Sequence, residues 1–316
     1  MSPNSWICLH PSNATQTTVS LDNRGLVYGD GFFTTMGVID GQILWLDYHQ
    51  QRLVSHAVAL QLQLDSFSLL TVLKTHAKQL QQGMLKLIIT RAEQEVRGYG
   101  YTPNIGGGSA CEIWLKSSPM AITTARSLPL ADGQFIPLQP TASAICLSSQ
   151  IACLPPTLAG LKSLNRLDNV LASGELQAIK AKTLAGTIKP SIAEGLLRDM
   201  SGQWVEGTMS NVFYQLVEAP VAKSSNRPHS QNNSSNYLTQ GQWYTPSMAQ
   251  SGVAGVMRQV IIDTLSTSNN PVIIRSLQDE DLPHLSQLFF CNALRGIMPM
   301  SSLRLLSGEV VSFEAI

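Results

Sequence analysis

Two side chains in the C-terminal half of the sequence have the types and surroundings that carbonyl chemistry requires. Lys162 follows the apolar stretch Leu158–Leu161 and precedes a predicted helix. An apolar environment favours the neutral amine, which is the form that attacks a carbonyl. Glu206 ends an apolar strand, where its carboxylate could face a cavity and keep a ring nitrogen protonated. Taken alone, each residue also fits a structural role, as a surface lysine that extends into solvent or a hairpin-end glutamate in water.

Two further features could hold an anion. Arg52 lies on a predicted helix one residue before its apolar stripe, so its guanidinium could bind a phosphate through two hydrogen bonds. It could equally pair with Asp47 or Glu95. The segment Ser251–Arg258 opens a helix with two glycines, so its free backbone N–H groups can face an anion. An amine, a carboxylate and an anion site together outline pyridoxal phosphate chemistry, which these features alone do not establish.

Apolar periodicity places these side chains on two α/β units. The first unit is expected to hold two short strands within 24–46 with a hairpin at Asp40-Gly41, helices at 48–62 and 67–82, and strands at 84–91 and 111–116. The second is expected to hold helices at 166–182 and 253–266 and strands at 193–199, up to 217, at 271–275, and near 287–291 and 308–312. The predicted class is therefore α/β (α+β) with two domains.

Prolines and polar residues suggest where the domains divide. A smaller N-terminal α/β domain is expected over 1–118, followed by a proline-rich connection over 119–136. The larger C-terminal domain is expected over 137–316. Within it, the polar segment 222–242 is expected to be a surface loop inserted in a hairpin.

Composition excludes several classes of protein. The chain has 21 basic and 21 acidic residues, so its zero net charge argues against a nucleic-acid partner. Charged residues are 13% and hydrophobic residues 44%, which predicts a large core. The five cysteines form no C-x-x-C pair, which favours reduced thiols and no metal site. No signal peptide or membrane-spanning stretch is evident, so a cytoplasmic protein without a membrane segment is expected.

Several motifs, in order along roughly 20–315, resemble known enzymes. The stretches Arg24–Thr35 and Asp47–Leu53 resemble the opening of the fold-type IV pyridoxal phosphate enzymes, the superfamily of the branched-chain and D-amino acid aminotransferases. Four later stretches look most like the 4-amino-4-deoxychorismate lyases: Lys162–Leu167, Glu206–Phe213, Gly252–Gln259 and Cys291–Ala293.

This resemblance implies a smaller N-terminal and a larger C-terminal domain with the cofactor, pyridoxal 5'-phosphate, at their interface, and a homodimer. It implies that Lys162 is the Schiff-base lysine and general base, that Glu206 pairs with the pyridine nitrogen, and that Arg52 binds the phosphate. Further cofactor contacts are implied for Asn165, Arg166, Val256, Met257, Asn292 and Ala293. On the substrate side, the resemblance implies carboxylate binding by Arg91 and Tyr99 and a lining made by Tyr28 and Thr35.

The implied activity is a carbon–oxygen lyase reaction of folate biosynthesis, which converts 4-amino-4-deoxychorismate to 4-aminobenzoate and pyruvate. Functional coupling to aminodeoxychorismate synthase is a further expectation.

A D-amino acid or branched-chain aminotransferase remains the rival, because Lys162–Asn165 is shared with the D-amino acid type. A non-enzymatic binding protein is a third reading. The chain departs from the lyase pattern in the length of 222–242 and in Glu93 and Glu95, which could disturb an anion site.

Overall fold

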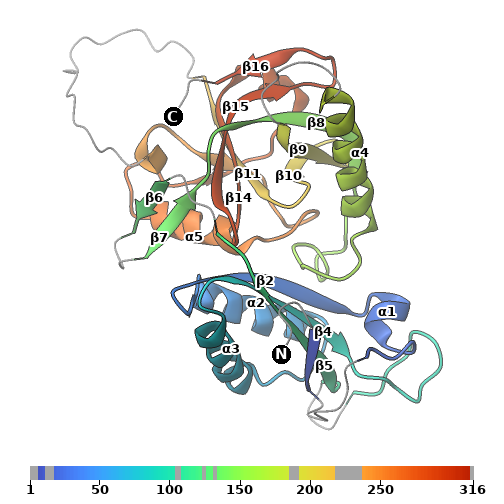
Figure 1. The fold of residues 1–316 in the computed structure, drawn as a ribbon. Helices are drawn as coiled ribbons and strands as arrows, with labels where there is room; N and C mark the ends of the chain where they lie inside the picture. Colours follow the sequence, from blue (N-terminus) through green and yellow to red (C-terminus); the bar gives the residue numbers. More distant parts are fainter. Residues whose placement is uncertain are drawn as a thin grey trace.

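A computed structural model of the chain describes residues 6–10, 18–103, 108–122, 126–130, 134–184, 192–217 and 237–313. Its strands form two separate sheets, one in each of two bodies that lie one above the other in Figure 1. Helices pack against both sheets, so the predicted mixed α/β class is confirmed. No helix within these described ranges is long and apolar enough to span a membrane.

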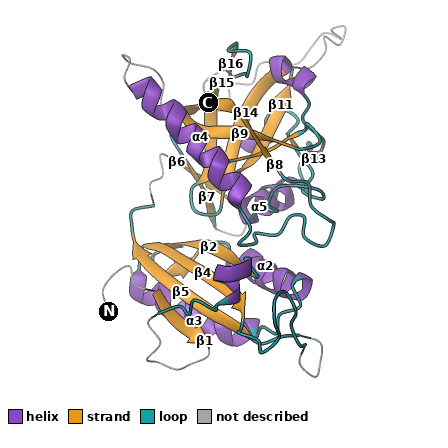
Figure 2. Ribbon diagram, turned by 90° about the vertical axis from the view of Figure 1, so that its right-hand side faces the viewer, coloured by secondary structure: helices purple, strands orange, loops and turns teal. Residues whose placement is uncertain are grey.

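The N-terminal body is a five-stranded antiparallel sheet covered by helices on one face (Figure 2). Its strands, in spatial order, are β1 (Trp6–His10), β5 (Cys111–Pro119), β4 (Gly83–Arg91), β2 (Gly31–Ile39) and β3 (Gln42–Ile43). The covering helices are α2 (Leu46–Ala59) and α3 (Ser66–Leu80), and a short α1 (Arg24–Tyr28) precedes β2. Alternate residues of β2, including Phe32, Met36 and Val38, pack into one core with the two long helices. The intervening residues Phe33 and Thr35 therefore face the other way.

The local predictions for this body hold with small shifts. Asp40 and Gly41 turn the β2–β3 hairpin with φ values of 50° and 68°, as expected for the dipeptide Asp-Gly. Asp47, which we expected to cap α2, lies instead in its first turn. The N-cap is Trp45, whose side chain makes no capping hydrogen bond.

The C-terminal body is built around a closed ring of six strands. They are β8 (Ala142–Ile151), β9 (Ile192–Asp199), β10 (Trp204–Gly207), β11 (Asn211–Leu216), β14 (Leu285–Asn292) and β15 (Gly296–Arg304), and each pairs with the next before β15 returns to β8. One side of every strand contributes to a single cluster that includes Trp204, Tyr214 and Phe290, which is the interior of the ring. The outward sides pack against α4 (Leu167–Leu184) and α5 (Val256–Leu265).

Short strands extend this ring. β6 (Arg126–Pro129) and β7 (Phe135–Leu138) continue the sheet beside β15, so the segment expected as a connection, 119–136, contains β6 and the start of β7. β12 (Tyr244–Thr245), β13 (Ile273–Ile274) and β16 (Val310–Ser312) complete it. Of the expected polar loop, 222–236 lies outside the described residues, and Tyr237–Thr239 forms a 3-10 turn (η1). A second 3-10 helix, η2 (Asp279–His284), precedes β14. Strands β1, β6, β7, β8, β12 and β15 were not predicted from the sequence.

The turn that starts β15 provides a test of this architecture. Gly296 has φ 70°, and a Cβ there would overlap the carbonyl oxygen of Pro137 on β7. Gly308 has φ 91° but has nothing within 4 Å of its Cβ position, which makes it a matched control. We expect Gly308→Ala to destabilise by roughly 1–2 kcal/mol, and Gly296→Ala by a further ~2 kcal/mol or more. Thermal unfolding would measure both, and equal losses would contradict the close β7–β15 approach.

Candidate active site

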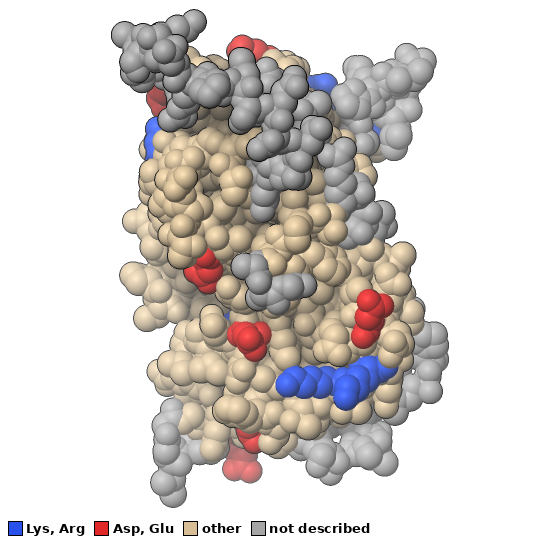
Figure 3. Space-filling model, turned by 90° about the vertical axis from the view of Figure 1, so that its left-hand side faces the viewer, with Lys and Arg blue, Asp and Glu red and all other residues tan. Residues whose placement is uncertain are grey.

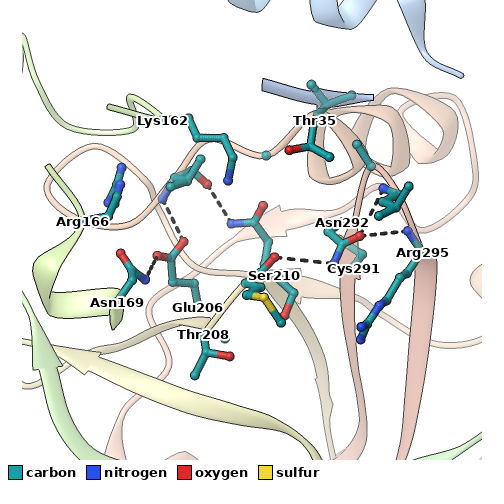
Figure 4. Close-up of a pocket in the computed structure, with 18 of the residues that line it drawn as sticks. Thr35, Lys162, Arg166, Asn169, Glu206, Thr208, Ser210, Cys291, Asn292 and Arg295 are labelled. Atoms are coloured by element: carbon teal, nitrogen blue, oxygen red, sulfur yellow. Dashed lines mark hydrogen bonds between the residues drawn. The ribbon is translucent and has the colours of Figure 1, made fainter. Parts of the chain in front are cut away.

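A cavity of about 500 Å³ lies between the two bodies. Its walls come from the outward face of β2, the segment that leads into α4, the β10–β11 turn, the start of α5, and the end of β14 with the turn that follows it. Figure 4 shows Lys162 and Thr35 entering from one side, with Glu206 and Asn169 on the opposite side. Residues far apart in the sequence therefore line one cavity.

Backbone hydrogen bonds to the N-terminal body fix the position of Lys162. The Lys162 carbonyl accepts from the Phe33 N–H (3.0 Å), and the Leu164 N–H donates to the Gly31 carbonyl (3.0 Å). The Lys162 N–H donates to Nε2 of His56 (2.9 Å). Burial, with Arg52 and other nearby cations, lowers the pKa of His56 to about 3, so its ring stays neutral and can accept this bond.

The surroundings of the Lys162 amine favour its neutral form. Burial, followed by the charge of Arg52, lowers its pKa from 10.5 to about 8, although Glu206 acts in the opposite direction. Nζ lies 4.6 Å from the centroid of the Phe33 ring. No ion pair joins Lys162 to a carboxylate within the described part of the chain. A larger fraction of this amine is thus neutral, and therefore nucleophilic, near neutral pH than of an ordinary lysine.

Glu206 is a buried carboxylate held from two sides. Only 3% of its surface is exposed, and burial raises its pKa although its hydrogen bonds lower it. Oε2 accepts from the Val253 N–H (2.8 Å), and Oε1 accepts from Nδ2 of Asn169 (3.4 Å). A Cβ at residue 252 would lie 3.0 Å from Oε2, and φ there is 75°, so Gly252 is needed for this approach.

A second buried carboxylate shapes the turn after Glu206. Glu194 on β9 accepts hydrogen bonds from the backbone N–H of Thr208 (3.0 Å) and from Oγ of Ser210 (2.6 Å). Both donors line the cavity. Glu194 therefore positions the wall without reaching the cavity itself.

Arg52 and the start of α5 form the anion-binding side. Arg52 is 7% exposed, and its Nη2 donates to the Ala254 carbonyl (2.7 Å). Among the described residues no carboxylate lies within 4 Å of it, so the expected alternative pairings with Asp47 or Glu95 do not occur. The N-cap of α5 is Gly255, whose lack of a side chain leaves the first N–H groups of the helix without a side-chain cap.

Positive charge exceeds negative charge around this cavity. Of the described lining residues, Glu206 is the only acid, whereas Arg52, Lys162, Arg166 and Arg295 are cationic. On the face drawn in Figure 3, the described residues are mostly uncharged, with a few basic and acidic patches. Arg52 is buried and Lys162 and Arg166 are half-buried, whereas Arg295 is exposed. Burying a cation without a counterion is costly, and a bound anion relieves that cost. No cluster of three or more His, Cys, Asp or Glu suited to a metal ion occurs in the described ranges.

The structure brings most of the predicted cofactor residues to the cavity. Lys162, Arg52, Glu206, Val256, Asn292 and Ala293 line it, as does Arg166. Met257 is fully buried behind Val256 in the α5 cluster. Asn165 is exposed, and its Nδ2 donates to the Gly29 carbonyl (3.3 Å), away from the lining. Oδ1 of Asn292 accepts from the N–H groups of Leu294 (3.1 Å) and Arg295 (2.9 Å), so it stabilises the turn after β14.

Of the four predicted substrate residues, only Thr35 lines the cavity. Arg91 is 3% exposed, pairs with Asp30 (2.9 Å), and donates to the carbonyls of Gln61 and Leu60 and to Oγ of Ser109. Its guanidinium is therefore engaged within the N-terminal body, which does not support binding of a substrate carboxylate there. Tyr99 is 84% exposed and lies against Tyr28 with ring centroids 5.1 Å apart, outside the cavity.

Sequence reasoning missed His56, Asn169 and Glu194. Asn169 lies three residues after Arg166 at the start of α4, a spacing that places both on one helix face. That spacing could have identified Asn169. Nothing in the sequence pairs His56 or Glu194 with the site, because both act through contacts with distant segments.

Comparisons with known proteins place the chain within one family. Residues 31–303 match the family described as amino-transferase class IV. Aminodeoxychorismate lyase from Vibrio harveyi is 24% identical over 289 residues, which cover 91% of this chain and 88% of that protein. The crystal structure of 4-amino-4-deoxychorismate lyase from Pseudomonas aeruginosa has a TM-score of 0.69 and 28% identity, covering 94% of this chain and 91% of that one. Branched-chain amino acid aminotransferase from Escherichia coli shares the fold, with a TM-score of 0.63, 16% identity, and coverage of 90% and 80%. The predicted resemblance is confirmed.

The lowered pKa of Lys162 predicts an unusual pH dependence. In the cofactor-free protein, acetylation of Lys162 by trace acetic anhydride should rise with a midpoint near pH 8, because only the neutral amine reacts. Mass spectrometry of the Lys162 peptide would measure it. Arg52→Met should raise the midpoint by removing a cation, and Glu206→Gln should lower it by removing an anion. A wild-type midpoint near 10.5 would contradict the described environment.

Proposed function

Because the chain belongs to the class IV amino-transferase family, we propose that it is a pyridoxal phosphate enzyme whose cofactor binds in the cavity between the two bodies. The donor set fits this group. Arg52, buried without a carboxylate partner, and the uncapped start of α5 suit a phosphate. Glu206 suits the ring nitrogen, and the Lys162 amine suits the aldehyde. When bound, pyridoxal phosphate supplies an electron sink for negative charge at the carbon next to the substrate amine.

We propose that the reaction is the conversion of 4-amino-4-deoxychorismate to 4-aminobenzoate and pyruvate. The lyases from Vibrio harveyi and Pseudomonas aeruginosa support it, since they match along nearly the whole chain. The observation that carries the proposal is the Lys162 amine, which faces a cavity rich in cations and whose lowered pKa, about 8, leaves about half of it neutral at pH 8. Such a cavity suits an anionic cofactor together with a substrate that carries two carboxylates.

The roles of the chain's own groups follow from their positions. The Lys162 amine removes the proton from the ring carbon that bears the substrate amine. The ring then becomes aromatic as its carbon–oxygen bond to the enolpyruvyl group breaks, and the departing enol of pyruvate takes up a proton. Glu206, held by Val253 and Asn169, would face the ring nitrogen of the bound cofactor. His56 keeps the Lys162 backbone in place.

The rival is an aminotransferase of the same fold, supported by the likeness to the Escherichia coli enzyme in fold alone. It would use Lys162 in the same position but would return the proton to the cofactor. The residues around Lys162 do not distinguish a lyase from an aminotransferase. The substrate that the protein converts does distinguish them.

Turnover is therefore the first test. The holoenzyme supplied with 4-amino-4-deoxychorismate should release equal amounts of pyruvate and 4-aminobenzoate, and Lys162→Ala should lower the rate by at least ~10³-fold. Lys74→Ala, on the exposed side of α3, is the control and should behave as wild type. Fast conversion of the bound cofactor to its amine form by D- or branched-chain amino acids, without pyruvate release from the chorismate substrate, would favour the aminotransferase.

We also propose that two copies of the chain associate. Leu167, Val170 and Leu171 on the first turns of α4 are 78%, 61% and 71% exposed, and Val170 also lines the cavity. A second copy over this apolar face would bury it and close the cavity on that side.

A cytoplasmic location and functional coupling to aminodeoxychorismate synthase remain part of the proposal.

Light scattering should therefore give twice the mass of one chain. Leu171→Glu should shift the protein toward the monomer because it places a charge in the apolar contact. Val58→Glu, an exposed apolar residue of α2, is the matched control. A monomeric wild type would refute the dimer.

A further inference from the structure

Two lysines without acidic partners lie side by side on the open face of the N-terminal sheet. Lys86 on β4 is paired in register with Lys116 on β5, so their side chains leave the same face of the sheet. Both are half-buried. Neither forms an ion pair within the described segments. Like charges directly opposite each other are unfavourable, so this arrangement needs a reason.

Lys86 adjoins the cavity through its other neighbour. It pairs in register with Thr35 on β2, which lines the cavity. Its Nζ lies 5.2 Å from the centroid of the Phe33 ring, a second lining residue. The Lys162 amine lies 4.6 Å from the same ring. The two amines therefore lie within about 10 Å of each other with one aromatic ring beside both.

The acidic residue nearest along this face does not neutralise the lysines. Glu112 leaves the same face of β5 as Lys116 but four residues earlier. Its Oε2 accepts from Nδ2 of Asn23 (2.8 Å) and from Nε1 of Trp114 (3.2 Å). Lys86 does not itself line the cavity, but it lies beside the lining residues Thr35 and Phe33 and forms no ion pair within the described segments, so an anion at this side of the cavity could pair with it.

The separation between the Lys86 and Lys162 amines limits which substrates can contact Lys86 while they react at the position of Lys162. A carboxylate that pairs with Lys86 takes up ~3 Å of the distance between the two amines. The reacting amine and that carboxylate can then be as much as ~7 Å apart. A carboxylate across a six-membered ring from an amine lies ~6 Å from it by ordinary bond lengths. The α-carboxylate of a simple amino acid lies only ~3 Å from its amine, so it reaches Lys86 only where the two amines are within ~6 Å, whereas a carboxylate across a ring fits separations up to ~9 Å.

We infer that Lys86 is a specificity residue that binds the substrate carboxylate lying across the ring from the reacting amine, on the wall formed by Phe33 and Thr35. This inference rests on the proposed lyase function and names the part of the substrate that Lys86 recognises. Lys116 adds positive charge beside Lys86 and does not need to contact the substrate itself. The charge of Lys86 also contributes, after those of Arg52 and Arg166, to the lowered pKa of Lys162.

The test compares the holoenzyme with Lys86→Met, which keeps the length of the side chain and removes its charge. We expect KM for 4-amino-4-deoxychorismate to rise ~10- to 100-fold with kcat changed less than ~3-fold, as for a lost hydrogen bond to a charged group. Lys86→Arg should restore much of the loss, and Lys74→Met should match wild type. The absorbance of the bound cofactor should be the same in all four proteins.

Calorimetry with the holoenzyme gives a readout independent of turnover. 4-Aminobenzoate keeps the amine and carboxylate across a ring, whereas aniline lacks the carboxylate. Lys86→Met should weaken binding of 4-aminobenzoate ~10-fold or more and leave binding of aniline unchanged. Wild-type turnover with unchanged KM and unchanged 4-aminobenzoate binding in Lys86→Met would overturn the Lys86 inference alone. An inactive wild type would overturn the lyase function, and the binding comparison would still decide the role of Lys86.

Discussion

The structure depends on keeping one amine and one carboxylate out of water within the same cavity. Lys162 has lost enough hydration for its pKa to fall to about 8, and Glu206 is almost fully buried. Neither group is neutralised by the other, since no ion pair joins them. Around them the lining is cationic. Without a bound anion, this arrangement of buried charged groups lowers the stability of the fold. Perturbed groups of this kind are typical of functional sites.

The same contacts that form the site also join the two bodies. The segment around Lys162 exchanges backbone hydrogen bonds with β2 and reaches His56 of α2. Arg52 of α2 donates to Ala254 before α5. The same hydrogen bonds therefore pack the two bodies together and position the Lys162 amine. A substitution that weakens this packing should also displace the amine.

Local sequence patterns predicted the helices and the hairpin, which are the elements that such patterns can identify. Periodicity identified α2, α3 and α4 to within a few residues, and Asp-Gly identified the β2–β3 hairpin. The missed strands β8 and β15 pair in parallel across long sequence separations, and short apolar runs do not reveal such partners. The resemblance located Lys162, Arg52 and Glu206, which the cavity brings together. The contacts of Arg91 could not be predicted from sequence, because its partners, Asp30 and the Leu60–Gln61 carbonyls, come from segments whose proximity exists only in the fold.

The central claim is that the buried Lys162 amine is the group that meets the cofactor aldehyde. Incubation of the protein with pyridoxal phosphate, reduction with borohydride and peptide mass mapping test it directly, because reduction makes the bond permanent. The account predicts one phosphopyridoxyl group per chain, on the peptide that contains Lys162, and its disappearance in Lys162→Arg. A label on any other lysine, or persistence of the label in that variant, would contradict the account.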